Sequence, residues 1–468
     1  MLFSSLLFIL GFLPLVLICY FIVPKKFRNI ILIIFSLIFY AWGEPIYIVL
    51  MIFSSLVDFV NGKMIEKYYD DKKKKKIFLI ISIVINLSLL GFFKYMPFLI
   101  DNLNSLFHLS ITPLDLALPI GISFYTFQTM SYSLDVYMGH VKAEKNFWNF
   151  LAYVSMFPQL IAGPIVRYET IRDELQERTV NFSKYSEGFA RFLRGLYKKV
   201  LIANGMGLLF ETIKATSNIS YVATWLMLIA FAFQIYFDFS GYSDMAIGMG
   251  KMLGFSFLEN FNYPYIAKSI TDFWRRWHIS LSTFFRDYLY IPLGGNRCSK
   301  LLNIRNIFVV WLLTGIWHGA AWNFMFWGIY YGVILILEKF VFGKYIEKWP
   351  NFLKHTYALI LILIGWLIFA FDDTKELYKY AANLLFLNKI PFINVETFYL
   401  LKNYGVLLLI ATVLSTPLVK NLSEKVFIHK NCVKLFKIVG VIVYIILFVI
   451  TIAYLVDGAY NPFLYFRF

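Results

Sequence analysis

Long apolar runs separated by short polar or basic segments dominate the chain. A helix needs about 20 mostly apolar residues to cross a bilayer. Runs near this length predict membrane-spanning helices, and shorter or broken runs add to them. These runs are residues 2–23, a hairpin over 29–61 that turns at 42–45, and 77–93, 147–161, 221–237, 242–257, 306–337, 357–371, 399–414 and 438–455. We predict an all-α integral membrane protein with roughly ten to twelve membrane segments.

Composition supports this class of protein. The chain is 60% hydrophobic and 15% charged, whereas soluble proteins are about 45–50% apolar and about 25% charged. The net charge of +16 predicts basic cytoplasmic loops that face anionic membrane lipid. No basic soluble domain is visible, so we expect no nucleic-acid partner. The three cysteines are isolated in the sequence. This argues against a disulfide framework and against a metal site.

The basic loops also orient the chain. Lysines and arginines gather at residues 25–28, 63–76 and 420–437, and such loops are predicted to be cytoplasmic. This places both termini outside the cell, including a tail at residues 457–468. We interpret residues 1–468 as one polytopic domain that makes multiple passes through the cell membrane.

One histidine interrupts the longest uncharged stretch. Residues 306–337 contain no Asp, Glu, Lys or Arg, and His318 lies near their middle. An ionisable residue at membrane depth costs roughly 2.5–3.5 kcal/mol and is a functional-site hypothesis by default. The structural alternative is an imidazole that only joins neighbouring helices. If both basic flanks are cytoplasmic, the stretch enters and returns, bending near Gly315 and Gly319; a single tilted helix is the alternative.

Two broken segments suggest irregular backbone around a central cavity. Residues 118–125 and 157–164 are too polar or too rich in Pro and Gly for ordinary spans, and such backbone is tolerated only inside protein or beside a wet cavity. No internal repeat is visible, which weakens a secondary-transporter interpretation.

Residues 268–290 predict an amphipathic helix. At about 100° per residue, one side carries Phe273, Trp277, Leu281, Phe284 and Tyr288, with Trp274 and His278 along its edge. The opposite side carries Asp272, Arg275, Arg276, Arg286 and Asp287. Such a helix suits a cavity wall or a plain interfacial anchor. The turn at 291–297 leads back to the uncharged stretch, so His278 and His318 can face one cavity.

A buried neutral imidazole can take a proton from a hydroxyl that attacks a thioester or an ester. Two carboxylates, Asp238 and Asp244, also stand in an apolar setting. Their spacing of six residues points them to different sides of a helix. We therefore expect each to form a structural salt bridge or to orient a histidine, and not to act as a pair of acids.

Several motifs resemble those of one family. Residues 272–278 read DFWRRWH, residues 286–295 read RDYLYIPLGG, and residues 317–320 read WHGA. These resemble the signature of the membrane-bound O-acyltransferases (MBOAT). Residues 3–8, 39–45 and 236–244 are similar to its alginate O-acetyltransferase branch.

The resemblance implies a fold with a central funnel, in which His318 corresponds to the catalytic histidine and His278 to a second functional histidine. It implies acyl transfer from a cytoplasmic thioester toward an extracellular polysaccharide, and an extracellular SGNH-type acetyltransferase partner. We expect acetyl-CoA as co-substrate and no bound cofactor. Donor binding or structural support is expected from Arg275, Arg276, Trp274, Trp317, Asp238 and Asp244, and the two arginines are equally suited to lipid anchoring.

The chain end has its own resemblance. Residues 462–468 read PFLYFRF, similar to the terminal Phe-Ile-Tyr-x-x-Phe pattern of a small protein used in teichoic-acid D-alanylation. This implies Tyr465 as an acyl acceptor that relays the group onward. An aromatic anchor at the outer interface is the alternative.

Two other functions stay open from the sequence. One is D-alanyl transfer to teichoic acid from a carrier-protein thioester. The other, of a different class, is a lipid or polysaccharide transporter in which His318 binds the ligand.

Overall fold

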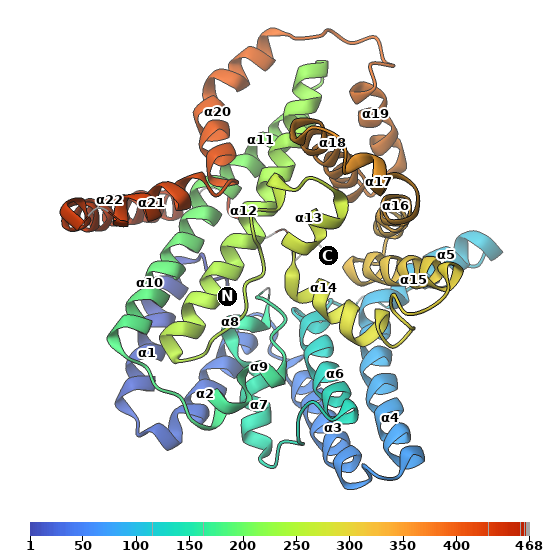
Figure 1. The fold of residues 1–468 in the computed structure, drawn as a ribbon, viewed down its shortest axis with the longest axis vertical. Coiled ribbons are helices and arrows are strands. Elements are labelled where there is room, and N and C mark those ends of the chain that lie inside the picture. Colours follow the sequence, from blue (N-terminus) through green and yellow to red (C-terminus); the bar gives the residue numbers. More distant parts are fainter. Residues whose placement is uncertain (115, 162, 429, 459, 463, 465–468) are drawn as a thin grey trace. The chain divides into compact units, whose positions relative to one another are not determined.

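The computed structural model confirms the all-α prediction: every regular element in the described residues is a helix (Figure 1). The description covers residues 1–468 except 115, 162, 429, 459, 463 and 465–468, and it leaves out the side chains of residues 426–434. The chain forms two compact units. Unit 1 comprises residues 1–192 and 243–259, and unit 2 comprises residues 193–242 and 260–468.

Unit 1 is built from short and long helices in chain order. They are η1 (Leu7–Phe12), α1 (Leu13–Ile22), η2 (Lys25–Phe27), α2 (Arg28–Ala41), α3 (Ile48–Lys67), α4 (Lys72–Leu90), η3 (Gly91–Tyr95), α5 (Met96–Phe107), α6 (Ile122–Met138), α7 (Phe147–Ser155), α8 (Phe157–Leu160), α9 (Tyr168–Gln176) and most of α10 (Phe182–Tyr197). The hairpin expected over residues 29–61 is present as α2 and α3. The span expected over residues 147–161 is wrong, because α7 and α8 are separated at Met156 and each is too short to cross a bilayer.

A buried carboxylate joins three helices of unit 1. α3, α4 and α6 lie side by side (Figure 1). Asp58 on α3 accepts hydrogen bonds from Asn86 of α4 at 2.7 Å and from Ser133 of α6 at 2.8 Å, and also from Ser82. Because lipid offers no hydrogen bonds, polar groups among membrane helices must find partners inside the protein.

Unit 2 contains the remaining elements. They are η4 (Lys198–Ala203), α11 (Asn204–Ala215), the first part of α12 (Tyr221–Leu253), η5 (Pro264–Ile266), α13 (Ile270–Arg276), α14 (Ile279–Phe285), η6 (Arg286–Tyr290), α15 (Lys300–His318), α16 (Trp322–Leu337), η7 (Glu338–Phe342), α17 (Gly343–Ile346), α18 (Asn351–Ala370), α19 (Thr374–Leu384), α20 (Val395–Leu414), α21 (Leu418–Ile428) and α22 (Lys430–Val456).

α12 corrects one sequence prediction. Two spans were expected over residues 221–237 and 242–257, but a single helix of 33 residues runs from Tyr221 to Leu253. The polar residues between the two apolar runs do not break it. Asp238 is neutralised by Lys199 at 2.8 Å, and Gly241 lets the backbone of Gly195 approach so closely that a Cβ there would lie 2.8 Å from its carbonyl oxygen.

The uncharged stretch folds as a helical hairpin, which confirms the predicted bend at Gly319. α15 ends at His318, residues 319–321 form the link, and α16 runs back against α15. Gly315 does not form the bend; it lies inside α15 and faces Gly328 of α16. A Cβ on Gly315 would lie 2.4 Å from the Phe324 carbonyl oxygen, so the absence of side chains permits the close approach of the two helices.

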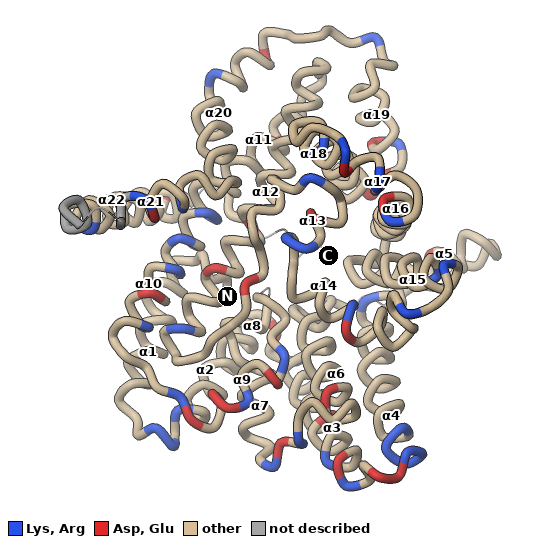
Figure 2. Tube along the Cα trace, in the orientation of Figure 1, with Lys and Arg blue, Asp and Glu red and all other residues tan. Residues whose placement is uncertain are grey.

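Eight helical segments are long and apolar enough to cross a membrane within the described residues, which supports a multi-pass membrane protein. They are Ile48–Lys67, Lys72–Phe107, Tyr221–Leu253, Lys300–His318, Trp322–Ile346, Asn351–Ala370, Val395–Leu414 and Leu435–Val456, and Leu7–Ile22 is a shorter apolar segment. Charge is confined to the ends of some of them: Figure 2 shows basic residues at one end of α4, whose remaining length is uncharged.

We predict that Gly328→Val separates α15 from α16 and lowers stability by about 1–3 kcal/mol, because overpacking a close contact forces the backbone to shift. A Cβ at this position would lie 2.5 Å from the Trp311 carbonyl oxygen. The measurement is the thermal unfolding midpoint in detergent. Gly405→Val in α20 is the matched control, since no atom lies within 4 Å of a Cβ there. Equal midpoints for the two variants would contradict the close packing.

Candidate active site

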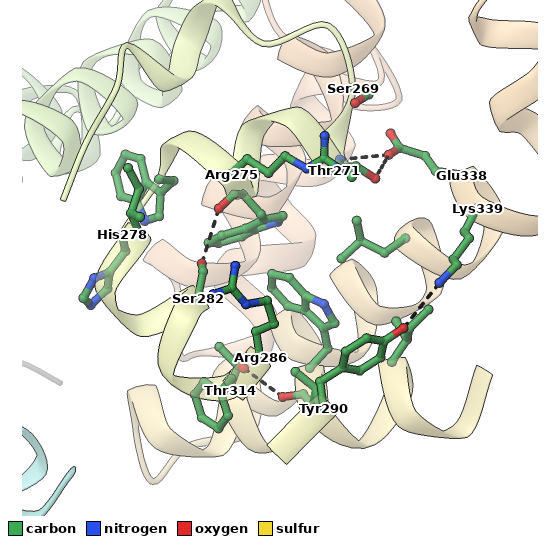
Figure 3. A pocket seen from close by; sticks show the side chains of 18 of the residues that line it. Ser269, Thr271, Arg275, His278, Ser282, Arg286, Tyr290, Thr314, Glu338 and Lys339 are labelled. Carbon is green, nitrogen blue, oxygen red and sulfur yellow. Dashed lines mark hydrogen bonds between the residues drawn. The ribbon is translucent and has the colours of Figure 1, made fainter. Parts of the chain in front are cut away.

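A cavity of about 990 Å³ in unit 2 contains both predicted histidines in its lining. Its walls come mainly from α13, α14, η6 and α15, with further residues from α16, η7, α17 and α18. Figure 3 shows His278 on one side of this group of side chains, with Glu338 and Lys339 on the other. The sequence prediction that His278 and His318 face one cavity is therefore confirmed.

His278 lies at a break between helices, so the single amphipathic helix predicted over residues 268–290 is wrong. α13 ends at Arg276, His278 has a φ of 43°, and α14 begins at Ile279. Asn260 explains the break: its carbonyl accepts from Ile279 N–H at 3.0 Å and its side-chain oxygen accepts from Ser280 N–H at 3.2 Å. These are bonds that a continuous helix would have made internally.

The same asparagine sets the state of the His278 ring. Asn260 Oδ1 lies 3.1 Å from His278 Nδ1, and an amide oxygen can only accept, so Nδ1 carries the proton and Nε2 keeps its lone pair. Nε2 has no hydrogen-bond partner among the described residues. Burial lowers the pKa of His278 well below its ordinary value, and nearby His318 lowers it further. The imidazole is therefore neutral near pH 7.

His318 is the last residue of α15 and is 7% exposed. Two aromatic rings stand edge-on to it, Trp327 at 4.9 Å and Phe369 at 5.4 Å between centroids. Trp317 is close to both imidazoles: its centroid is 5.1 Å from that of His318 and 6.2 Å from that of His278. Trp317, which the sequence predicted to support the site, therefore packs its ring against both histidines.

Trp274 belongs to a cluster of aromatic side chains beside the cavity. Its centroid lies 4.6 Å from Trp311, 5.4 Å from Trp327 and 4.9 Å from Tyr331, all in edge-to-face contacts. Trp274 also lines the cavity, and its Nε1–H has no acceptor among the described residues. The cluster gives one wall a largely apolar surface, with the indole N–H of Trp274 as a polar donor.

The two adjacent arginines differ in their surroundings. Arg275 lines the cavity, is exposed, and forms no ion pair within the described part of the chain. Arg276 does not line the cavity; it pairs with Asp272 at 2.8 Å and donates to the carbonyl of Asn262 at 3.3 Å. Of the two, Arg275 is therefore the one placed to meet a ligand in the cavity.

Other charged residues also line the cavity, and of these the sequence analysis named only Arg286, without assigning it to the site. Arg286 and Lys339 line the cavity; Arg286 pairs with Asp287 at 2.6 Å, and Lys339 donates to Asn296 at 2.5 Å. Lys268 and Lys354 also belong to the lining. These residues come from separate helices and loops, so only the fold brings them together.

Glu338 is a buried carboxylate that the sequence analysis missed, although it directly follows the uncharged stretch. It accepts from Ile270 N–H at 2.7 Å, Thr271 N–H at 2.8 Å and the Thr271 hydroxyl at 2.7 Å. The carboxylate thereby satisfies the free N–H groups at the first turn of α13. This holds in place the helix that carries Trp274 and Arg275.

The two acidic residues predicted to form salt bridges both do so. Asp238 pairs with Lys199 at 2.8 Å within unit 2. Asp244 pairs with Arg191 at 2.5 Å within unit 1, where Arg191 also meets Glu259. Neither carboxylate lines the cavity. Tyr465, the predicted acyl acceptor, lies outside the described residues.

Comparisons with known proteins place this geometry in context. A family model described as MBOAT, membrane-bound O-acyltransferase family, matches residues 140–378, about half of the chain. A protein of Azotobacter vinelandii named "Probable alginate O-acetylase AlgI" is 40% identical over 419 residues, covering 87% of this chain and 84% of the relative. A Helicobacter pylori "Peptidoglycan O-acetyltransferase" is 35% identical, covering 83% and 80%. A Bacillus subtilis "Teichoic acid D-alanyltransferase" is 29% identical, covering 52% and 65%.

We predict that Glu338→Gln destabilises unit 2 by about 1–3 kcal/mol, because the amide NH₂ replaces one oxygen and then faces backbone donors. The measurement is again the thermal midpoint in detergent. Glu347→Gln is the control, since Glu347 lines the same cavity but is exposed. If Glu338→Gln melts at the wild-type temperature, the carboxylate does not hold α13.

Proposed function

The chain belongs to the membrane-bound O-acyltransferase family, and we propose that this O-acyltransferase moves acetyl groups from a cytoplasmic thioester donor, with acetyl-CoA as co-substrate, to an extracellular or cell-wall polysaccharide. The observation that carries the proposal is the pair of buried histidines in one cavity with cationic side chains in its lining. The family assignment contradicts the transporter alternative.

In the proposed chemistry, His318 is the general base. It takes the proton from an acceptor hydroxyl as the oxygen attacks the thioester carbonyl. The new C–O bond forms, the C–S bond breaks, and the thiolate leaves and is protonated to the free thiol. The aromatic rings around His318 exclude water, which protects the thioester from hydrolysis.

His278 supports this step as a neutral imidazole. The hydrogen bond from Nδ1 to Asn260 fixes its ring, and Nε2 remains able to accept a hydrogen bond. A neutral ring beside His318 also avoids placing a second positive charge near the base, which would lower its proton affinity. We assign His278 to positioning the donor or the acceptor, and Trp274 and Trp317 to supporting the cavity wall.

The cationic residues of the lining suit the phosphates of the donor. Arg275, Arg286 and Lys339 lie in one lining, and guanidinium and ammonium groups bind phosphates through charge-assisted hydrogen bonds. The cavity volume of about 990 Å³ falls within the common range for small-molecule sites, about 300–1,000 Å³. Arg276 is proposed only as a structural residue, because Asp272 already holds it.

For the second half of the reaction we propose that Tyr465 accepts the acetyl group as a phenyl ester. A phenolate is a good leaving group, so onward transfer is favourable. An extracellular SGNH-type acetyltransferase partner would take the acetyl group and place it on a polysaccharide hydroxyl. The predicted extracellular position of residues 457–468 supports this order of steps.

Acetyl is favoured over D-alanyl as the transferred group. The relatives named as O-acetyltransferases match this chain at 35–43% identity, while the Bacillus subtilis D-alanyltransferase matches at 29% over half of the chain. D-alanyl transfer from a carrier-protein thioester is the second candidate, and the choice of donor separates the two.

We predict that His318→Ala lowers acylation by about 10²–10⁴-fold, the usual contribution of a general base. The measurement is transfer of radiolabelled acetyl from acetyl-CoA to glycan in inverted membrane vesicles that contain the partner. His108→Asn is the control, because His108 is exposed on α5's end in a left-handed conformation that asparagine also adopts.

The same vesicles distinguish the donors. If a D-alanyl carrier protein labels the glycan and acetyl-CoA does not, the acetyl proposal is wrong and the D-alanyl candidate replaces it. If His318→Ala labels as fast as wild type with either donor, His318 is not the base.

We predict that Tyr465→Phe abolishes polysaccharide acetylation in cells while leaving the amount of protein in the membrane unchanged, because only the phenolic oxygen is removed. The measurement is acetate released from the extracellular glycan by mild alkali. Tyr454→Phe on α22 is the matched control, since Tyr454 is exposed among apolar residues of the same helix. Full acetylation in Tyr465→Phe cells would show that the chain end serves only as an anchor.

A further inference from the structure

A buried ion pair in unit 2 has no part in the cavity. Lys199 and Asp238 lie 2.8 Å apart, and the two residues are 1% and 2% exposed. Burying two charges is costly, and apolar side chains of similar size are often no less stable in such places. We therefore expect this buried ion pair to have a role other than stabilising the fold. Lys199 is carried by the π-helical segment η4, a local irregularity that is frequent at functional sites.

The ion pair is shared with the last described residues of the chain. Lys199 Nζ donates to the carbonyl of Pro462, and Asp238 Oδ2 accepts from Leu464 N–H at 3.1 Å. Each charge thus meets one main-chain group of opposite polarity. Lys199 also donates to Asn204 at 2.9 Å, and Asn204 in turn donates to the Asn461 side chain at 3.1 Å.

The neighbouring surface also fits this segment. Gly207 faces the ring of Tyr460, and a Cβ on Gly207 would lie 3.0 Å from that ring and 2.4 Å from the Gln234 amide. Leu464 itself is 6% exposed. The segment is therefore received by a built site, which we call the C-terminal dock: Lys199, Asp238, Asn204 and Gly207.

The dock is connected to the candidate active site through α12. Asp238 is followed by Phe239, whose ring stands edge-on to His278 at 4.7 Å between centroids. On the other side, Leu464 is followed directly by Tyr465 in the chain. The dock therefore binds the backbone of Leu464, the residue directly before the proposed acceptor. It does so through Asp238 on α12, and the next residue of α12, Phe239, contacts His278.

We propose that the C-terminal dock is a positioning site for the acyl relay: the Lys199–Asp238 pair binds the main-chain groups of Pro462 and Leu464 and so restrains the proposed acceptor that follows, Tyr465, for its reaction. The positioning role rests on the proposed function of Tyr465. The binding of the segment to the dock does not depend on that function. Pro462 and Leu464 contact the ion pair through backbone groups, and the Leu464 side chain packs in the hydrophobic core of unit 2.

Docking is tested by the reactivity of a thiol introduced by Leu464→Cys, in a protein whose natural cysteines are replaced by serine. The backbone N–H that contacts Asp238 is kept in this variant. We expect slow maleimide labelling in detergent, and labelling at least about tenfold faster when Lys199→Met or Asp238→Asn is added, because loss of a charge-assisted hydrogen bond shifts local opening by about that factor or more.

Two further variants keep the test decisive. Asn204→Ala is a milder change that removes one contact of the segment, and a smaller acceleration is expected. Lys214→Met is the matched control, because Lys214 forms a half-buried ion pair with Glu376 at 2.9 Å in the same unit. Unchanged labelling in Lys199→Met, Asp238→Asn and Asn204→Ala, or equal acceleration in Lys214→Met, would overturn the dock.

Positioning is tested separately from docking. With the natural Leu464, Lys199→Met should lose glycan acetylation in vesicles but retain His318-dependent transfer from acetyl-CoA to an added small phenol, N-acetyltyrosinamide, which needs no tail. Loss of both activities would indicate a purely structural pair and contradict the positioning role. Faster thiol labelling together with full glycan acetylation would contradict it as well. Failure of wild type to use acetyl-CoA would refute the proposed donor and leave the labelling result intact.

Discussion

The hydrogen bonds made by Asn260 are the interaction on which the candidate active site depends. Asn260 accepts hydrogen bonds from the backbone N–H groups of Ile279 and Ser280, the two residues that follow His278. It thereby anchors the first residues of α14 and holds the His278 ring through Nδ1. The result is a neutral imidazole at a fixed angle in the cavity wall. Without this tether, residues 268–290 would be free to form the continuous amphipathic helix that their sequence favours.

A second constraint brings His318 to the same cavity. The α15–α16 hairpin places a histidine at the turn of two apolar helices, where its ring is surrounded by aromatic side chains. Gly315 and Gly328 allow the two helices to touch through their backbones. Glu338, at the far end of α16, then fixes the first turn of α13. The cavity is thus assembled from elements that hold one another by backbone contacts as well as by side chains.

Buried charge is used consistently in this molecule. Asp58, Asp238 and Glu338 each lie in apolar surroundings, and each is matched by donors from other helices or from the ends of helices. Such groups are expensive to bury alone, so each one marks a place where separate segments must meet. In unit 1 this is the meeting of α3, α4 and α6. In unit 2 it is the start of α13 and the place where Pro462 and Leu464 meet Lys199 and Asp238.

The sequence by itself determined the class of protein and the family, and it indicated the two histidines as candidates, because apolar runs, charge-free stretches and contiguous motifs are local properties. It left open whether the uncharged stretch bends or forms one tilted helix, and the tertiary structure decided for the hairpin. It also indicated that Asp238 and Asp244 would each form a salt bridge with a separate partner. It could not identify Lys199 or Arg191 as their partners, or Asn260 as the tether of His278, since these residues are distant in the chain and carry no pattern of their own. For the same reason it predicted two spans where α12 is one continuous helix. It also predicted one helix over residues 268–290, where α13 and α14 are separated at His278. Local propensity sets which segments are helical, but hydrogen bonds between distant segments decided where those helices stop and which side chains share the cavity.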